Sequence, residues 1–233
     1  LERLHHLEQR LNQLLLPTNP KIHYDKLHQP LQPYSQTTRT SKTVLKCYFS
    51  VRSPYSYLGL KRAIELAEYY QIPLELKPVL PMLMRNLPVP KQKSLYIITD
   101  VKREADFFGI DFGNIADPLG EGVKRCYALF NYAKTQGKGN QFMLNFMQGV
   151  WAKGIRSETD KGMRKIIEKT GLNWQQAKKH LNDQQWHTWA EDNLASLYDM
   201  GLWGVPSFKY QDTCVFGQDK LYFIEQAIIS GEL

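Results

Sequence analysis

Two serines, separated by two residues, stand where an apolar segment gives way to a helical one. Residues 53–56 are Ser-Pro-Tyr-Ser, and they follow the apolar stretch 44–51. Serine followed directly by proline is typical of a helix N-cap with proline at the first helical position. A hydroxyl at a helix N-terminus can also hydrogen-bond an anion, because the unpaired N–H groups and the helix dipole favour negative charge there. Ser53 is therefore a candidate for chemistry as well as a cap.

The elements around these serines predict a sheet with a helix between its first strands. The run 44–51 predicts a buried strand, a helix is expected from Pro54 onward, and alternating residues over 72–79 predict a second strand. Such a strand-helix-strand unit is parallel and right-handed by default. Near the C-terminus, 205–210 and 213–217 predict two further strands, and Asp219 is expected to cap a final helix.

Between the second and third strands the chain is mostly helical. Apolar residues at spacings of three and four predict helices near 99–108, 121–136, 140–152, 159–170, 173–182 and 184–200. The whole order, β-α-β, helical insertion, β-β-α, is that of a thioredoxin-like α/β fold. We therefore expect a thioredoxin-like domain formed by 44–81 and 202–233, with an all-helical insertion domain at 82–201.

Two segments precede this domain. Leucines recur every three or four positions in residues 1–16, which predicts an amphipathic helix that packs on the domain or on a partner. Residues 17–43 are rich in proline, glutamine, serine and threonine without a sustained period, which predicts a linker or a surface arm. A helix and linker in this place would also suit the second half of a tandem protein whose first half is absent here.

Two motifs fall where a thioredoxin-like fold keeps its active site. The segment between the first strand and the first helix is the usual place of a C-x-x-C pair, because the helix N-terminus stabilises a thiolate. Here it is S-x-x-S, which cannot exchange disulfides, but a serine can donate a hydrogen bond to the thiolate of a ligand such as glutathione. The second motif is Val205-Pro206, where a cis proline before the third strand would expose the preceding backbone to an extended peptide.

With these residues in place, the sequence resembles a branch of the DsbA-like thioredoxin superfamily, the 2-hydroxychromene-2-carboxylate isomerases and kappa-class glutathione transferases. The resemblance spans about residues 45–230. Its residues are SPYSYLGL (53–60), NLPVPKQKSLYIITD (86–100), GLWGVPSF (201–208) and FGQDKL (216–221).

The resemblance implies a role for polar residues near the predicted first helix. Ser53 resembles the family's serine that hydrogen-bonds and activates the glutathione sulfur. Asn86 resembles a polar contact near glutathione and substrate, and Lys93 resembles a lysine that reaches the same site. Tyr55 and Tyr57 are candidates to line the substrate pocket or to pack beneath the first helix. Each polar residue also has a structural interpretation, as a cap, a loop residue or a surface charge.

Four further positions would hold glutathione itself. Val205 corresponds to the residue whose backbone pairs with the cysteinyl unit, ahead of cis-Pro206. Gln218 and Asp219 match the pair that holds the γ-glutamyl end.

Composition limits the classes of partner. The formal net charge is +7, from 30 Lys and Arg against 23 Asp and Glu, which favours an anionic small molecule. The basic residues alternate with acidic ones, so we expect no nucleic-acid partner. The six histidines lack ligand spacing, so no metal is predicted. No apolar window approaches the roughly 18 residues of a membrane span, and the first residues do not resemble a signal peptide. These features predict a cytoplasmic protein without a membrane partner.

The three cysteines do not predict redox chemistry. Cys47, Cys126 and Cys214 are far apart and odd in number, which argues against a disulfide scaffold and a dithiol centre. The apolar surroundings of Cys47 and Cys214 predict buried, inert thiols.

Taken together, the sequence predicts a glutathione-dependent isomerase or transferase that acts on an aromatic or conjugated electrophile, with Ser53 stabilising the glutathione thiolate. A homodimer is expected from the resemblance. The alternatives are a non-catalytic or chaperone-like DsbA-type module, and a thiol-disulfide oxidoreductase by family label only.

Overall fold

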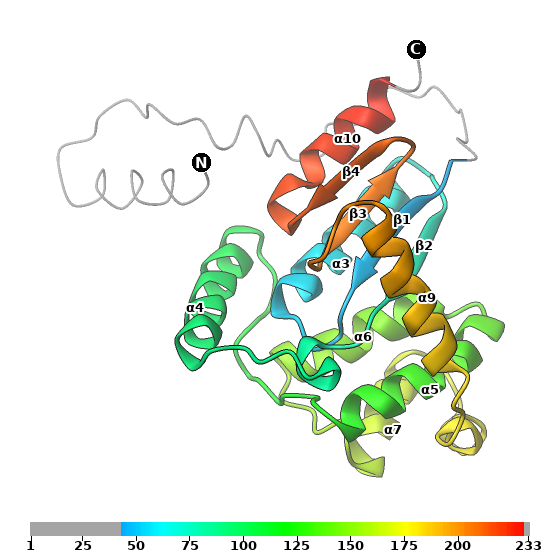
Figure 1. Ribbon diagram of the computed structural model, residues 1–233. Coiled ribbons are helices and arrows are strands. Elements are labelled where there is room, and N and C mark those ends of the chain that lie inside the picture. The colour runs from blue at the N-terminus through cyan, green and yellow to red at the C-terminus, as the bar shows by residue number, and fades with distance from the viewer. Residues whose placement is uncertain (1–42, 231–233) are drawn as a thin grey trace.

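The computed structural model describes residues 43–230 as a four-stranded sheet with helices on both faces and a group of helices beyond one end of the sheet (Figure 1). The predicted helix at 1–16 and nearly all of the predicted arm at 17–43 lie outside the described residues. The thioredoxin-like α/β fold that the sequence predicted is confirmed, with its helical segments placed between the second and third strands.

The register of the strands brings four connections to one end of the sheet. The strands are β1 (Leu45–Phe49), β2 (Leu74–Pro78), β3 (Ser207–Tyr210) and β4 (Thr213–Phe216), in the order β2-β1-β3-β4. β1 and β2 are parallel and end together, with Phe49 opposite Pro78. The antiparallel β3 begins beside the end of β1, and Ser207 is paired with Phe216 at the end of β4. We call this end, at Phe49, the carboxyl end of the sheet.

Helices cover both faces of the sheet. Phe208, the partner of Cys47 in β1, reaches α3 (Pro54–Tyr69), against which α10 (Leu221–Ser230) also packs. Tyr48, one residue further along β1, points to the opposite face because side chains alternate along a strand. There its hydroxyl lies 2.8 Å from Oγ of Ser196 in α9 (Trp186–Asp199). The sequence-based division placed α9 in the insertion, but in the structure this helix contacts the sheet.

The remaining helices lie between β2 and α9. They are α4 (Lys91–Phe107), α5 (Glu121–Thr135), α6 (Gly139–Ala152), α7 (Asp160–Lys169) and the short α8 (Trp174–Ala177). The helix expected near 99–108 begins earlier, at Lys91. The spacing of apolar residues missed its first turns because these turns are exposed and carry no apolar stripe. The helix expected at 173–182 is wrong in length, since α8 gives way to a 3₁₀ turn at Lys178–His180.

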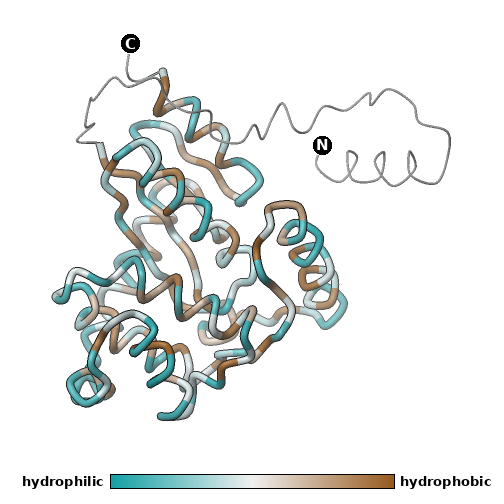
Figure 2. The backbone as a smooth tube through the Cα atoms, turned by 180° about the vertical axis from the view of Figure 1, so that it is seen from behind, coloured by the Kyte–Doolittle hydropathy of each residue, from teal (hydrophilic) through white to brown (hydrophobic). Residues whose placement is uncertain are grey.

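One hydrophobic core joins the sheet to these helices. Buried residues of β1 and α3 belong to the same cluster as the aromatic residues Phe142 and Phe146 of α6. Figure 2 shows hydrophobic stretches running through the interior and hydrophilic ones on the outer turns of the helices. Within residues 43–230, no helix is both long enough and apolar enough to cross a bilayer.

Two aromatic side chains from this helical group donate hydrogen bonds to the backbone just beyond the ends of β1 and β2. Trp151 of α6 donates from Nε1 to the Val51 carbonyl at 3.0 Å, and Tyr127 of α5 donates to the Val79 carbonyl at 2.6 Å. Both contacts are buried, so each satisfies a carbonyl that would otherwise lack a partner away from water. The helical group thus fixes the backbone that leads from β1 toward Ser53.

The cysteines are all free thiols. Cys47 and Cys126 are fully buried, and burial raises the pKa of both thiols well above the usual value. Cys214 is only partly buried, near the sulfur of Met200, so the prediction of a buried thiol is wrong for this residue. Its strand, β4, lies at the edge of the sheet and leaves it less covered.

Replacing Gly59 with alanine should destabilise the fold. A Cβ at Gly59 would lie 3.0 Å from both Pro206 Cγ and Phe208 Cζ, and a proline ring cannot turn aside. We expect Gly59→Ala to lower the free energy of unfolding by about 1–3 kcal/mol, measured by urea denaturation. Gly149→Ala is the matched control in a helix, because its nearest neighbour is the flexible side chain of Ile166 at 3.3 Å. An equal loss in both variants would contradict the role of the Pro206 contact.

Replacing Trp151 with phenylalanine tests its hydrogen bond to the backbone that follows β1. The change keeps an aromatic ring but leaves the Val51 carbonyl unpaired, which should cost about 1–3 kcal/mol of unfolding free energy. Trp189→Phe is the control, because the buried Nε1 of Trp189 has no partner among the described residues. If thermal and urea denaturation show the same loss for both variants, the Trp151 hydrogen bond does not stabilise this backbone.

Candidate functional site

The candidate site lies at the carboxyl end of the sheet, where the four connections meet. These are the segments 50–53 after β1, 79–86 after β2, 200–206 before β3 and 217–220 after β4. Every residue that the resemblance assigned to glutathione falls in one of them except Lys93. Within residues 43–230, no three or more His, Cys, Asp or Glu side chains gather into a metal-binding group.

The two serines of S-x-x-S have different surroundings. Ser53 is the N-cap of α3, and its Oγ accepts a hydrogen bond from the Ser56 amide at 3.2 Å. Ser53 is partly exposed and donates its hydroxyl hydrogen to no described residue. Ser56 is 0% exposed, and its Oγ accepts from the Ser50 amide at 3.3 Å. Only Ser53 can therefore offer a hydrogen bond to a ligand.

The electrostatics at Ser53 favour an anion. Pro54 follows the cap, and the first turn of α3 contains no acidic residue. The helix is 16 residues long, so its N-terminus carries the full positive end of the helix dipole. A thiolate beside the Ser53 hydroxyl would meet both a hydrogen-bond donor and this positive end.

The connection before β3 carries the second motif. The Val205-Pro206 peptide bond is cis, and the Pro206 carbonyl accepts a hydrogen bond from the Gly217 amide at 2.9 Å. Pro206 also packs against Gly59 of α3, which places this connection beside the helix that Ser53 caps. The amide and carbonyl of Val205 form no hydrogen bond within the described part of the chain. This backbone is available to an extended ligand.

Gln218 and Asp219 share the 3₁₀ turn Gln218–Lys220 but differ in exposure. Gln218 is 3% exposed, and its Nε2 donates to Glu104 of α4 at 3.3 Å. Arg62 of α3 donates to both the side-chain and the backbone oxygen of Gln218. Because its side-chain amide is hydrogen-bonded within the protein, Gln218 holds the turn in place and is not available to contact a ligand.

Asp219 is exposed and forms no hydrogen bond or ion pair with residues 43–230. The prediction that it caps the final helix is wrong, because α10 begins at Leu221 and the 3₁₀ turn intervenes. An exposed carboxylate without a partner among these residues can accept from a ligand ammonium.

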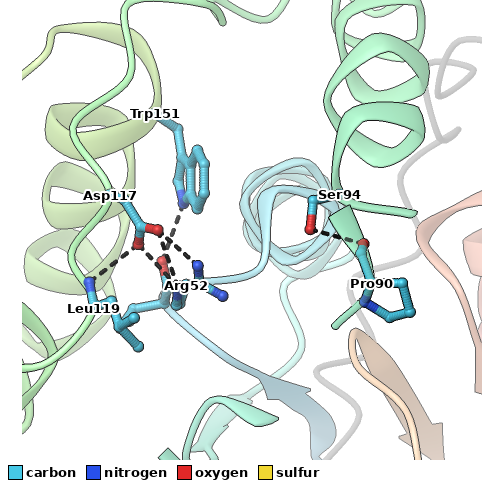
Figure 3. A network of polar contacts seen from close by, with 7 residues as sticks. Arg52, Pro90, Ser94, Asp117, Leu119 and Trp151 are labelled. Carbon is cyan, nitrogen blue, oxygen red and sulfur yellow. Dashed lines mark hydrogen bonds and ion pairs between the residues drawn. The ribbon is translucent and has the colours of Figure 1, made fainter. Parts of the chain in front are cut away.

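Asn86 and Lys93 flank the loop between β2 and α4. Asn86 follows the 3₁₀ turn Met82–Arg85 with a left-handed φ of 59° and is exposed. Lys93 is exposed in the first turn of α4, beside Ser94, whose hydroxyl donates to the Pro90 carbonyl (Figure 3). Neither side chain forms a hydrogen bond or ion pair with another described residue, Ser53 included.

The two candidate pocket tyrosines lie in different places. Tyr55 is partly exposed and donates its hydroxyl to Asp100, which ties α4 to the first turn of α3. Tyr57 is 1% exposed and belongs to the core. Burial, and next the charge of Asp111, raise the pKa of Tyr57 to about 12. Of the two, only Tyr55 presents any surface beside the cap.

Sequence reasoning missed the ion pair next to Ser53. Arg52 donates to Asp117 from Nε at 2.9 Å and from Nη2 at 2.7 Å, and Asp117 also accepts from the Leu119 amide (Figure 3). The guanidinium beside the cap is therefore neutralised within the chain. The partners are 65 residues apart, and nothing in the local sequence of either one signals the pairing.

An exposed aromatic pair also went unnoticed. Trp203 is 68% exposed, and its ring lies 5.8 Å from that of Phe216 at the end of β4. A Cβ at Gly204 would lie 2.4 Å from the Phe216 ring, so only glycine allows this approach. The sequence feature that could have indicated this pair is Trp203 itself, a large aromatic residue two positions before Val205 in GLWGVPSF.

Known proteins share this architecture. The chain is 21% identical, over 194 residues, to a protein of Pseudomonas putida named 2-hydroxychromene-2-carboxylate isomerase, with 79% of this chain and 94% of the relative covered. A solved structure of a 2-hydroxychromene-2-carboxylate isomerase superimposes with a TM-score of 0.68 at 21% identity, covering 80% of this chain and 95% of that one.

Disulfide-active proteins with the same fold also match. The cytosolic disulfide reductase DsbM of Pseudomonas aeruginosa, solved with GSH, gives a TM-score of 0.58 at 14% identity and covers 80% of this chain and 99% of its own. At these identities the structural likenesses show the fold alone. The family model of the DSBA-like thioredoxin domain matches residues 44–229, most of the chain. The chain therefore belongs to the DSBA-like thioredoxin domain family.

Proposed function

We propose that this protein is a glutathione-dependent isomerase that acts on an aromatic or conjugated electrophile. The observation that carries the proposal is the Ser53 hydroxyl, whose hydrogen is uncommitted within the described residues at the N-terminus of α3. A glutathione thiolate placed there is stabilised by that hydroxyl and by the helix dipole. The relatives named as isomerases support enzymatic activity of this class.

The chemistry needs no net oxidation or reduction. The thiolate adds to a carbon of the conjugated system, a C–S bond forms, and the electron pair moves onto the conjugated carbonyl oxygen. The former double bond is now single and rotates. The electron pair then returns, the C–S bond breaks and the thiolate is restored. A transferase outcome results if the adduct is protonated on carbon and keeps the C–S bond.

The rest of the site supplies contacts to glutathione. Val205 offers an unpaired amide and carbonyl, which suit an extended peptide backbone. Asp219 offers an exposed carboxylate to the γ-glutamyl ammonium, and Gln218 holds the turn that presents it. Asn86 and Lys93, both exposed, are proposed as further polar contacts near glutathione and the substrate. The structure of DsbM with GSH supports a glutathione ligand on this fold.

The alternatives are a non-catalytic or chaperone-like DsbA-type module and a thiol-disulfide oxidoreductase, the second of which matches the names of several structural neighbours. Thiol-disulfide exchange itself is disfavoured, because Ser53 and Ser56 occupy the place of the cysteine pair and two of the three thiols are fully buried. Failure of calorimetry to detect glutathione binding to the folded chain would favour the non-catalytic module.

Replacing Ser53 with alanine tests the thiolate contact. A hydrogen bond to a charged group contributes about 1.5–3 kcal/mol, so the pKa of the bound glutathione thiol should rise by about one to two units in Ser53→Ala. Because less thiolate is then present at neutral pH, turnover should fall about tenfold and recover as the pH is raised. Thiolate absorbance of the bound glutathione, titrated against pH, measures the shift.

Two variants control for the change at the cap. Ser53→Thr keeps a hydroxyl and the cap, so its bound thiol should titrate like that of the wild type. Ser56→Ala removes the buried hydroxyl and should leave the thiol pKa unchanged. An unaltered thiol pKa in Ser53→Ala, with circular dichroism showing a folded chain, would rule out the proposed role of Ser53.

Asp219→Asn tests the contact to the γ-glutamyl end. Removing the charge should weaken glutathione binding about tenfold, because an ammonium-carboxylate hydrogen bond is lost, while the bound thiol pKa stays constant. Asp212→Asn is the matched control, since Asp212 is an exposed aspartate in the turn at the other end of the sheet. Equal affinities of wild type and Asp219→Asn in calorimetry would exclude this contact.

A further inference from the structure

We infer that Asp117 is a positioning residue for the thiol chemistry at Ser53, because it holds the Arg52 guanidinium in an ion pair and so sets the net charge beside the cap. The inference rests on the proposed function and adds the residue pair that tunes the reactivity of the bound thiol. It follows from the place of Arg52 in the chain, from the geometry of its bonds and from the pairing of the charges around it.

Arg52 lies in a tight turn that leads directly into the cap. The Ser53 amide donates to the Ser50 carbonyl at 2.9 Å, so Arg52 is the third residue of this turn and immediately precedes the cap. The residue before it is also fixed, because the Val51 carbonyl accepts from Nε1 of Trp151. The Arg52 guanidinium can therefore lie no further from Ser53 than one residue and one arginine side chain allow.

Two-point bonding fixes the position of this positive charge. Nε of Arg52 donates to Oδ1 of Asp117 at 2.9 Å, and Nη2 donates to Oδ2 at 2.7 Å, so both carboxylate oxygens are used (Figure 3). The Leu119 amide donates to the same carboxylate at 3.0 Å and fixes it in its own loop. The Arg52 side chain is only 24% exposed, so water screens its charge incompletely. A bidentate pair has one preferred geometry, and Asp117 therefore decides where the guanidinium lies.

A second ion pair acts on the same turn of α3. Asp111 lies in the same connection as Asp117, between α4 and α5, and is paired with Lys153 at 2.7 Å. Its charge reaches the first turn of α3, where it is the second cause, after burial, of the raised pKa of Tyr57. The two ion pairs together add no net charge beside the cap. Loss of one partner of the Arg52 pair would change that charge by a full unit.

A balanced charge suits a thiolate that has to add to a substrate and then leave it. An unpaired guanidinium beside the cap would lower the thiol pKa further, and a thiolate of lower pKa is a weaker nucleophile. An unpaired carboxylate there would raise the thiol pKa and leave little thiolate at neutral pH. By pairing Arg52 with Asp117, the chain leaves the stabilisation of the thiolate to the Ser53 hydroxyl and the dipole of α3.

The substitution Ser53→Cys reports the charge at the cap without glutathione. It is made together with Cys214→Ser in the full chain, which leaves as other thiols only the fully buried Cys47 and Cys126. The pKa of the reporter thiol is read from the pH dependence of its alkylation by iodoacetamide. Adding Asp117→Asn should lower this pKa by about half a unit to one unit, and adding Arg52→Met should raise it by a similar amount. Adding both should return the pKa to that of the parent.

The controls separate charge from a structural tie. Asp117→Glu and Arg52→Lys keep the charges, so the reporter pKa should stay close to that of the parent. Glu168→Gln breaks an exposed ion pair of α7 with Arg164 and should have no effect. In 1 M salt, where the screening length is about 3 Å, the opposite shifts should shrink. If Asp117→Asn does not fold, Arg52→Met and Arg52→Lys decide, because only loss of the charge should raise the reporter pKa.

The same variants with Ser53 in place connect the inference to the proposed function. The pKa of the bound glutathione thiol should fall in Asp117→Asn and rise in Arg52→Met. Reporter shifts of the same sign in both variants, or an unchanged reporter pKa in either folded one, would overturn the inference even if Ser53 binds glutathione as proposed. Opposite reporter shifts in a chain that does not bind glutathione would instead refute the proposed function and retain the control of charge at the cap.

Discussion

The structure depends on the hydrogen bonds that the backbone carbonyls receive where the sheet ends. β1 and β2 finish side by side, and beyond them the carbonyls of Val51 and Val79 no longer have strand partners. The helical group supplies Trp151 and Tyr127, whose N–H and O–H donate to these carbonyls in buried contacts. Because both donors come from long side chains on packed helices, the exits of the two strands are fixed in space. The Ser53 cap and the 3₁₀ turn Met82–Arg85 begin a few residues later, so the fixed strand ends position both of them.

The site combines a rigid frame with uncommitted polar groups. Gly59 lets Pro206 lie against α3, and the Ser56 hydroxyl accepts a hydrogen bond from the backbone amide of Ser50 ahead of the cap. Within it, the Ser53 hydroxyl and the Val205 backbone remain available to a ligand. Preorganised donors of this kind stabilise developing or bound negative charge without reorganising during the reaction.

Local sequence patterns predicted most of the fold and part of the site. Alternation and three-four spacing placed the strands, α3 and the helices α5 to α7, because each buries a continuous apolar face. The pattern failed for the first turns of α4, which are exposed, and for Cys214, whose burial depends on an edge strand. It could not show that Gln218 is satisfied by Arg62 and Glu104, since such partners meet only in the folded chain. The homodimer, the cytoplasmic location and the roles of Asn86 and Lys93 stay predictions.

The 3₁₀ turn of Gln218 and Asp219 has a thermodynamic consequence. One residue of the turn is locked into a buried cluster with Arg62, whose guanidinium also lies 3.9 Å from the centre of the Phe108 ring, while its neighbour faces water. The backbone of the turn is thus ordered before any ligand arrives. A ligand that contacts Asp219 has to restrict little more than one short side chain, so most of the interaction energy appears as affinity instead of being lost to ordering a loop.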